Sequence, residues 1–332
     1  MNHRLLLSSG VAVVLAVVPA SAVAELVNLS WDNDFLTGTD RGYTNGVRLA
    51  YLSNSDKDRG KRLSGMMATA RDKLAFLPGI GSPDAEHAVT ASLRQLMVTP
   101  GDISEPEPQY NDIPYVGHLA LSTTFWSWTE ESITGFGGHL GVIGPESGAE
   151  AIQKWVHKAT GSEKPRGWGN QLGTDVVGGL QVAHARKLFQ TGAGGDLQQR
   201  VAVIGSGLLS SFRTSVKTGA IWQFGRRLPV NFVPEYSGTS STIALPASLN
   251  TQGSGWSVFV GLGLEYVGYS YIDDNSGPYR FDEGPVIGQL GIGAAWQWNR
   301  VHAGLIFRAT TGEDDRHKDN FSFGTLSLSW EL

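Results

Sequence analysis

Long runs in which apolar residues strictly alternate are the feature that most limits how this chain can fold. In the run 256–266, one face carries large apolar side chains and the other carries mostly small or polar ones. The same period of two recurs in 286–298, in 301–309 and at the end of the chain, with aromatic residues near the ends of the runs. Alternation places successive side chains on opposite faces of a β-strand. Runs this long are typical of strands that cross a bilayer, which takes about 9–11 residues.

Strands in a membrane have to close on themselves, because lipid cannot satisfy backbone N–H and C=O groups. The alternation therefore predicts an all-β fold, a transmembrane antiparallel β-barrel of about twelve strands. We expect these strands near 25–34, 42–53, 88–98, 114–128, 133–144, 172–189, 196–207, 211–226, 254–271, 282–297, 299–311 and 320–332. An even number is expected when both termini face the periplasm. The longer linkers are expected to lie mostly on the extracellular side, near 54–87, 99–113, 145–171, 227–253 and 312–319.

The first 24 residues have the pattern of a cleaved secretory signal peptide. An apolar core at 5–18 follows Arg4, and Ala22-Val23-Ala24 forms a small-residue cleavage site before Glu25. No later stretch contains the 18 or more consecutive apolar residues typical of a membrane helix. The chain has no cysteine and a net charge of −5, which argues against a disulfide scaffold and against a nucleic-acid partner. We expect a protein of the bacterial outer membrane with a mature chain of residues 25–332.

One segment breaks the alternation. In 145–163, Ser147 and Glu150 match a helix-capping pair, and Gly161 stands where a helix would end. The spacing predicts a short helix over about 147–160, on the extracellular side between strands 5 and 6. Gln153 and His157 lie four residues apart and so share one face of this helix. Its apolar stripe consists of Ile152, Trp155, Val156 and Ala159. A helix that only plugs or caps the barrel, with an ordinary surface histidine, is the alternative interpretation.

The first predicted hairpin carries more polar side chains than a turn requires. Its Asp, Asn and Thr residues are Asp32, Asn33, Asp34, Asp40, Thr44 and Asn45. Alternation places Asp34 and Thr44 on the inward face and Asn33 on the outward face. Carboxylates this close repel each other without a cation, and Ca²⁺ prefers oxygen donors of these kinds. A plain hairpin loop is the alternative interpretation.

Three stretches together resemble the LpxR-type lipid A 3'-O-deacylases, which are outer-membrane enzymes that remove the 3'-linked acyloxyacyl group of lipid A. The stretches are Asn33-Asp34 with TDRGYTNG at 39–46, GVIGP at 141–145 followed by Gln153 and His157, and Gly167-Trp168 with Gln171-Leu172. The resemblance spans the whole mature chain. It implies calcium-dependent ester hydrolysis of lipopolysaccharide in a cleft between the barrel wall and the extracellular loops.

The resemblance also assigns roles to individual residues. The positions that match the family's catalytic set are His157, Gln153, Thr44, Asn33 and Asp34. The candidate ligands of Ca²⁺ are Asp34, Asn33 and Glu163. The family has an active-site lysine in the loop after strand 3, but here that loop reads TPGDISEPEPQYNDIPY and contains no lysine. This departure leaves open how an anionic substrate or an oxyanion is stabilised.

Ester hydrolysis needs a base that activates water and donors that face the developing oxyanion. The ordinary pKa of histidine, about 6.5, suits the first task. We therefore assign His157 as the general base and Gln153 as the residue that orients the water or the imidazole. The sequence contains neither the G-x-S-x-G elbow of a serine hydrolase nor the H-E-x-x-H motif of a zinc enzyme.

Other functions stay open at this stage. An outer-membrane phospholipase would need a Ser–His pair, and no suitable serine is evident near His157. A porin or a binding barrel without activity is a further alternative, although a twelve-stranded barrel with bulky inward residues should conduct poorly. The sequence does not determine the acyl chain that is removed, the identity of the metal or the oligomeric state.

Overall fold

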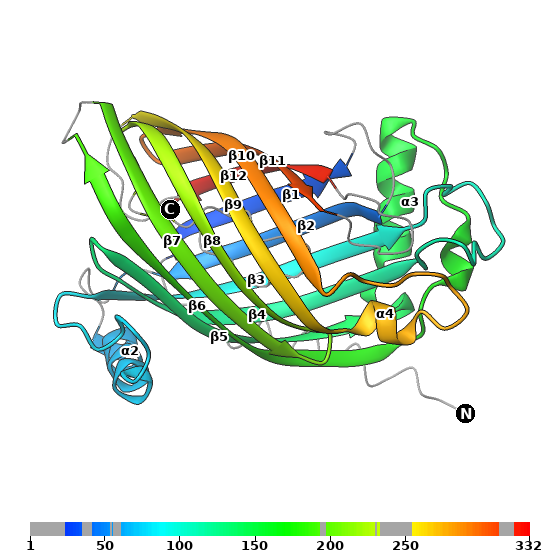
Figure 1. Ribbon diagram of the computed structural model, residues 1–332, viewed down its shortest axis with the longest axis horizontal. Coiled ribbons are helices and arrows are strands. Elements are labelled where there is room, and N and C mark those ends of the chain that lie inside the picture. The colour runs from blue at the N-terminus through cyan, green and yellow to red at the C-terminus, as the bar shows by residue number, and fades with distance from the viewer. Residues whose placement is uncertain are drawn as a thin grey trace.

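The computed structural model contains one closed barrel in which every strand pairs antiparallel with its neighbours in sequence, and the first strand pairs with the last (Figure 1). The structure describes residues 24–34, 42–53, 55, 61–192, 197–229, 231–232, 254–311 and 322–332. The strands are β1 Ala24–Asn33, β2 Gly42–Ser53, β3 Glu86–Thr99, β4 Val116–Trp128, β5 Ser132–Ile143, β6 Asp175–Thr191, β7 Leu197–Ser210, β8 Arg213–Arg226, β9 Gly255–Ser270, β10 Val286–Trp298, β11 Val301–Thr310 and β12 Ser322–Glu331.

The predicted fold class and the twelve predicted strands are confirmed. The largest difference is at β10, which begins at Val286 rather than at 282. Pro285 directly precedes this strand, and proline has no N–H to donate to a neighbouring strand. The predicted signal peptide, apart from Ala24, lies outside the described residues. Among the described residues, no helix is long and apolar enough to cross a membrane.

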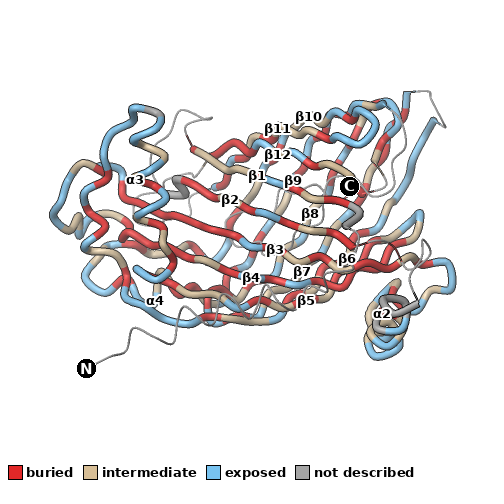
Figure 2. Tube along the Cα trace, turned by 180° about the vertical axis from the view of Figure 1, so that it is seen from behind, coloured by how far each residue is buried: buried red, intermediate tan, exposed pale blue. Residues whose placement is uncertain are grey.

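The two faces of the wall differ as the alternation predicts. Five paired outward residues form a row across β1 to β5, and all are exposed: Leu29, Leu49, Leu93, Leu121 and Leu140. Many inward positions are buried, and many of these carry polar side chains. Figure 2 shows buried and exposed residues alternating along the strands. Arg213 and Glu265, for example, form a buried ion pair of 3.0 Å between β8 and β9. The row of leucines is the surface expected to face lipid.

The short helices lie at the two ends of the barrel. α2 (Lys61–Leu74) connects β2 to β3, at the end that also carries the start of β1 and the end of β12 (Figure 1). The opposite end carries η2 (Pro145–Ser147), α3 (Ala149–Thr160), η3 (Gly167–Asn170) and α4 (Tyr271–Asn275). The long linker 54–87 therefore lies on the side of the termini, and the linker 227–253 also joins its strands, β8 and β9, at that side. The expectation that these two linkers are extracellular is wrong. Both termini are expected in the periplasm, and on that expectation the end with α3 is called the extracellular end.

The predicted helix between strands 5 and 6 is α3, but it begins differently from the expectation. Gly148, with a φ of 74°, precedes the helix, and no side chain caps it. Ser147 instead ends the 3-10 turn η2, and Glu150 forms an ion pair with Lys154. The predicted capping pair is therefore wrong. Gly161 ends the helix in the left-handed conformation, with a φ of 74°, as expected.

Candidate functional site on the outer rim

Asn33, at the end of β1, belongs to a row of residues that crosses four strands. Asn33 pairs with Asn45 on β2, Asn45 with Met97 on β3, and Met97 with Gly117 on β4. Each member lies four positions from an exposed leucine on the same strand, at 29, 49, 93 and 121, so the row faces the outside of the barrel. At about 4.8 Å between strands, the row spans roughly 14 Å. It lies at the extracellular rim, where β1 and β3 end and β2 and β4 begin.

α3 lies against the β3 and β4 members of this row, Met97 and Gly117, on the outside of the wall. A Cβ atom added to Gly117 would lie only 2.6 Å from the Cβ atom of Ala149 and 2.2 Å from Oγ of Ser147, so β4 and the start of α3 are in close contact. Between the wall and the helix is one buried apolar cluster, formed by Met97, Ile103, Tyr115, Ala149 and Trp168. In Figure 1 the axis of α3 runs across the strand ends.

Gln153 faces the wall from the second turn of α3, and only 2 % of its surface is exposed. The indole Nε1 of Trp168, in η3, donates a hydrogen bond of 2.6 Å to Oε1 of Gln153. This bond fixes which end of the carboxamide points toward Trp168. The amide nitrogen Nε2 is buried and has no hydrogen-bond partner among the described residues. Gln153 therefore presents N–H donors that an acceptor from outside the chain would satisfy.

His157 lies one turn further along α3 and is held by the chain that follows the helix. Its Nδ1 lies 2.5 Å from the backbone oxygen of Glu163. A carbonyl oxygen can only accept, so Nδ1 carries the proton and the neutral ring has its lone pair on Nε2. The ring is partly exposed, whereas the Glu163 side chain is exposed. The structure thus connects His157 to Glu163 through the backbone of Glu163.

The structure places the predicted oxygen donors of the first hairpin as follows. Asn33 is on the outer face, and because α3 also lies outside, Asn33 needs no bulge to face the same region. Asp34 follows β1 directly and is 2 % exposed. Thr44 lies where the pairing register shifts between Tyr43 and Asn45, and its side chain is outside the described part of the chain. Residues 35–41, which include Asp40, also lie outside the described residues.

Two residues that the sequence reasoning did not assign to the site belong to it. One is Trp168, which orients Gln153. The other is Asn45, which is 7 % exposed and pairs with Asn33, and whose Oδ1 is buried with no hydrogen-bond partner among the described residues. Both residues lie in stretches that carried the family resemblance, but no spacing rule links them to His157.

The donor set at this corner of the rim fits a hard cation. Asn33 pairs with Asn45 and is followed in the chain by Asp34, so amide and carboxylate oxygens, the ligands that Ca²⁺ prefers, lie at this corner. The buried Oδ1 of Asn45 would be satisfied by such an ion. Within the described residues, no group of three or more His, Asp, Glu or Cys side chains could hold a metal ion. An ion here would therefore rely largely on neutral oxygens.

The loop between β3 and β4, which contains no lysine, supports the site through its backbone. The backbone oxygen of Ile103 accepts a hydrogen bond from the Arg166 N–H at 2.8 Å and from the Tyr115 hydroxyl at 3.2 Å. Burial raises the pKa of Tyr115 to about 12, so its hydroxyl stays protonated. Tyr115 also packs against Trp168, with 5.0 Å between ring centroids. This loop therefore supports η3 through its contacts with Arg166 and Trp168, and Trp168 in turn orients Gln153.

A second connection reaches the site from the opposite side of the barrel. The segment between α4 and β10 carries Tyr279, whose hydroxyl donates to the backbone oxygen of Asn170 in η3 at 3.1 Å. The rings of Tyr279 and Tyr110 are 5.4 Å apart, and the N–H of Arg280 donates to the backbone oxygen of Tyr110. Loops from β3–β4, β5–β6 and β9–β10 therefore contact one another at the extracellular end.

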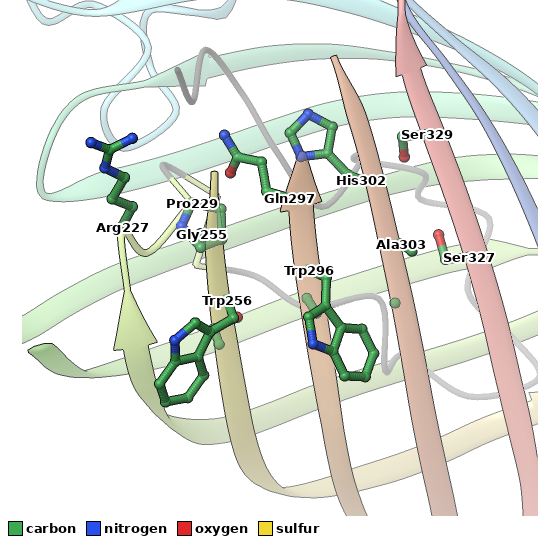
Figure 3. Close-up of a pocket in the computed structure, with 13 residues that line it drawn as sticks. Arg227, Pro229, Gly255, Trp256, Trp296, Gln297, His302, Ala303, Ser327 and Ser329 are labelled. Atoms are coloured by element: carbon green, nitrogen blue, oxygen red, sulfur yellow. The ribbon is translucent and has the colours of Figure 1, made fainter. Parts of the chain in front are cut away.

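The pocket in Figure 3 is at the other end of the barrel, where β10 ends and β11 begins. Gln297 and His302 lie on one side of the wall there, whereas Trp256 and Trp296 lie on the other. His302 is 3.4 Å from a carboxylate oxygen of Glu331. None of the predicted site residues lines this pocket. It is therefore separate from the candidate site.

A closed twelve-stranded barrel with outward leucines and a polar cluster under a rim helix belongs to the class of outer-membrane β-barrel proteins. Residues 5–332 match a family model described as outer membrane protein LpxR. The chain is therefore a member of the LpxR family.

Among solved structures, the chain is similar to LpxR from Salmonella typhimurium, with a TM-score of 0.73 and 17 % sequence identity, over 92 % of this chain and 100 % of that one. This similarity shows a shared fold. KdgM porin and NanC porin match less well, each with a TM-score of 0.36, at 5 % and 6 % identity, over 92 % of this chain and 99 % and 98 % of theirs. No curated protein matches the chain.

Proposed function

We propose that this protein is a lipid A 3'-O-deacylase that hydrolyses the 3'-linked acyloxyacyl ester of lipopolysaccharide in the outer membrane. Membership of the LpxR family supports the reaction class. The observation that carries the proposal is the pair on α3, in which His157 is fixed through Nδ1 and Gln153 has a buried, unsatisfied amide nitrogen. Both residues belong to a helix on the outer side of the barrel rim, so a lipid would not have to enter the barrel to approach the site.

His157 is the general base of the proposed reaction. Its Nε2 accepts a proton from water while the water oxygen attacks the acyl carbonyl carbon. The same nitrogen then gives the proton to the sugar oxygen as the carbon–oxygen bond breaks. The products are a carboxylic acid and a sugar hydroxyl. The backbone oxygen of Glu163 keeps Nδ1 protonated, which fixes the tautomer and stabilises the imidazolium that forms during the first step.

Gln153 is the proposed donor to the developing oxyanion. Trp168 holds Oε1, so the two N–H groups of Nε2 are the part of the carboxamide that can reach the substrate. Donors fixed in advance in a site shielded from water stabilise a developing negative charge without having to reorganise. The absence of a lysine from the β3–β4 loop makes such a donor more important here.

Asn33, Asp34 and Asn45 are the residues that would hold a Ca²⁺ ion, with Glu163 as a further candidate from the family resemblance. When bound, the ion would supply positive charge near the oxyanion and polarise the ester carbonyl. The chain's own contribution is to hold these oxygens at the end of β1 and the start of β2, in the same row as Met97 and Gly117, which α3 contacts.

The proposal is tested by replacing His157 with asparagine and measuring the lipid A of cells that carry each variant by mass spectrometry. Wild-type protein should remove the 3' acyloxyacyl group, and His157→Asn should leave lipid A intact while the barrel still folds. His302→Asn, at the opposite end of the barrel, is the matched control and should retain activity. Equal deacylation by wild type and His157→Asn would exclude His157 as the base, and intact lipid A with the wild type would exclude the reaction itself.

The same cells separate the leading proposal from phospholipase activity. Thin-layer chromatography of the phospholipids should show no lysophospholipid above the level of the His157→Asn strain. Accumulation of lysophospholipid with unmodified lipid A would replace the proposed substrate by a glycerophospholipid.

A further inference from the structure

In α3 the most exposed side chains are apolar and a polar side chain is buried, which is the reverse of a helix that packs on a water-soluble protein. The side that contacts the barrel carries Ala149 and the polar Gln153, which are 1 % and 2 % exposed. The side that faces away carries Trp155, which is 70 % exposed, and Ile152, which is 39 % exposed. An amphipathic helix on a water-soluble protein turns its apolar stripe toward the core. Here Ile152, Trp155 and Ala159 of the predicted apolar stripe are exposed, and only Val156 is half-buried.

The exposed stripe is next to the part of the barrel that faces lipid. α3 begins on the outer face of β4, four positions beyond the exposed Leu121 on the same strand. On the strands that flank the α3 segment, Leu140 of β5 is 64 % exposed and Val176 of β6 is 65 % exposed. The apolar outer surface of the barrel therefore continues to the rim from which α3 projects.

The remaining side chains of α3 suit a helix at the boundary between acyl chains and head groups. Tryptophan is enriched at that boundary, because its ring is apolar and its N–H is polar. Lys158 is exposed one turn after Trp155, and its long stem can follow an apolar surface while the amine reaches an anionic head group. An apolar face flanked by lysine is typical of helices that lie in the plane of a membrane.

We propose that α3 lies in the interface of the outer leaflet and that Ile152 and Trp155 insert among its acyl chains. The partner is the lipid surface that already covers the leucine row of the barrel, which the helix extends at the rim. The opposite face of the helix then holds Gln153 and His157 at the level where head groups meet acyl chains. The membrane contact does not depend on the esterase activity, so either proposal can fail without the other.

The absence of cysteine from the chain makes a direct test possible. Single cysteines are introduced by Trp155→Cys and, as a second position, by Ile152→Cys, in the full-length mature protein folded into vesicles of phosphatidylcholine and phosphatidylglycerol. Each is labelled with a nitroxide, and the accessibility of the label to oxygen and to a water-soluble nickel complex is measured by electron paramagnetic resonance. Leu121→Cys provides the lipid-facing reference, and Glu107→Cys, in the exposed β3–β4 loop, provides the aqueous reference.

The proposal predicts an oxygen-to-nickel ratio at positions 152 and 155 that is severalfold above that at 107 and close to that at 121. A ratio at both positions equal to that at 107 would show that α3 is in water and would overturn the proposal. Protection of both positions from both reagents would overturn it as well, because a second protein chain rather than lipid would then cover the stripe. If one cysteine variant does not fold, the other position gives the same decision.

Discussion

The hydrogen bond from Trp168 to Gln153 gives the sharpest test of the proposed oxyanion donor. Trp168→Phe keeps an aromatic ring in the cluster but removes the N–H that Oε1 of Gln153 accepts at 2.6 Å. Because Gln153 is 2 % exposed, water cannot replace this donor without a rearrangement. A buried acceptor without a partner costs about 1–3 kcal/mol. The carboxamide is expected to turn to avoid this cost, and its Nε2 then leaves the catalytic orientation.

The size of the expected effect follows from the same free energy. If the full 1–3 kcal/mol appears as a lower population of correctly oriented Gln153, kcat falls by about five- to 150-fold. KM should change little, because the bond does not contact the bulk of the lipid. The barrel should remain as resistant to heat as wild type, since η3 lies outside the wall. Turnover of purified lipid A in detergent micelles, followed by mass spectrometry, measures kcat and KM, and gel mobility after heating measures the stability of the barrel.

A double-mutant cycle separates orientation of Gln153 from loss of packing. Gln153→Met should lower kcat on its own, and adding Trp168→Phe to it should lower kcat by no more than about twofold further. Full activity of Trp168→Phe, or a second drop as large as the first in the double variant, would refute the role of Trp168 as a positioning residue.

Three further outcomes are expected. Tyr279→Phe removes the 3.1 Å hydrogen bond to Asn170, which is worth about 1 kcal/mol, and should lower kcat by about fivefold without changing the stability of the barrel. An unchanged kcat would show that η3 needs no support from the β9–β10 loop. Gly117→Ala places a methyl group 2.6 Å from the Ala149 Cβ atom and should displace α3, so that deacylation is lost. The barrel itself should still migrate as folded protein in the heated-gel assay. Normal activity would contradict the packing of α3 on β4. Asn45→Leu should weaken calcium binding measured by titration calorimetry, whereas equal affinity would exclude Asn45 as a ligand.

The sequence predicted the barrel well because its main determinant is local. Alternation with a period of two requires only the residues of one strand, and it correctly placed Leu262 and Glu265 on opposite faces of β9. The errors occurred where local patterns have more than one structural solution. Ser147 and Glu150 match a capping pair, but the reciprocal pair does not form: Oγ of Ser147 lies near β4 and accepts from the Ala149 N–H at 3.4 Å, and Glu150 pairs with Lys154.

Much of the candidate site could also be predicted from the sequence. The spacing of Gln153 and His157 on one helical face needed only helical geometry, and the family resemblance named Asn33 and Asp34. Asn45 and Trp168 were not assigned, since their importance depends on contacts with Asn33 and Gln153, which lie 12 and 15 residues away on other elements. No spacing within one element reveals such contacts.

By itself, the sequence determined that the chain closes into a membrane barrel, since alternation and the need to pair every backbone group in lipid leave few other solutions. It also determined that a helical segment, which interrupts the alternating pattern, carries Gln153 and His157. Only the tertiary structure decided that this helix lies outside the wall, against Met97 and Gly117 of the row, with Ile152 and Trp155 exposed. Periodicity defines which residues share a face, whereas the partner of that face depends on contacts between residues that are distant in the chain.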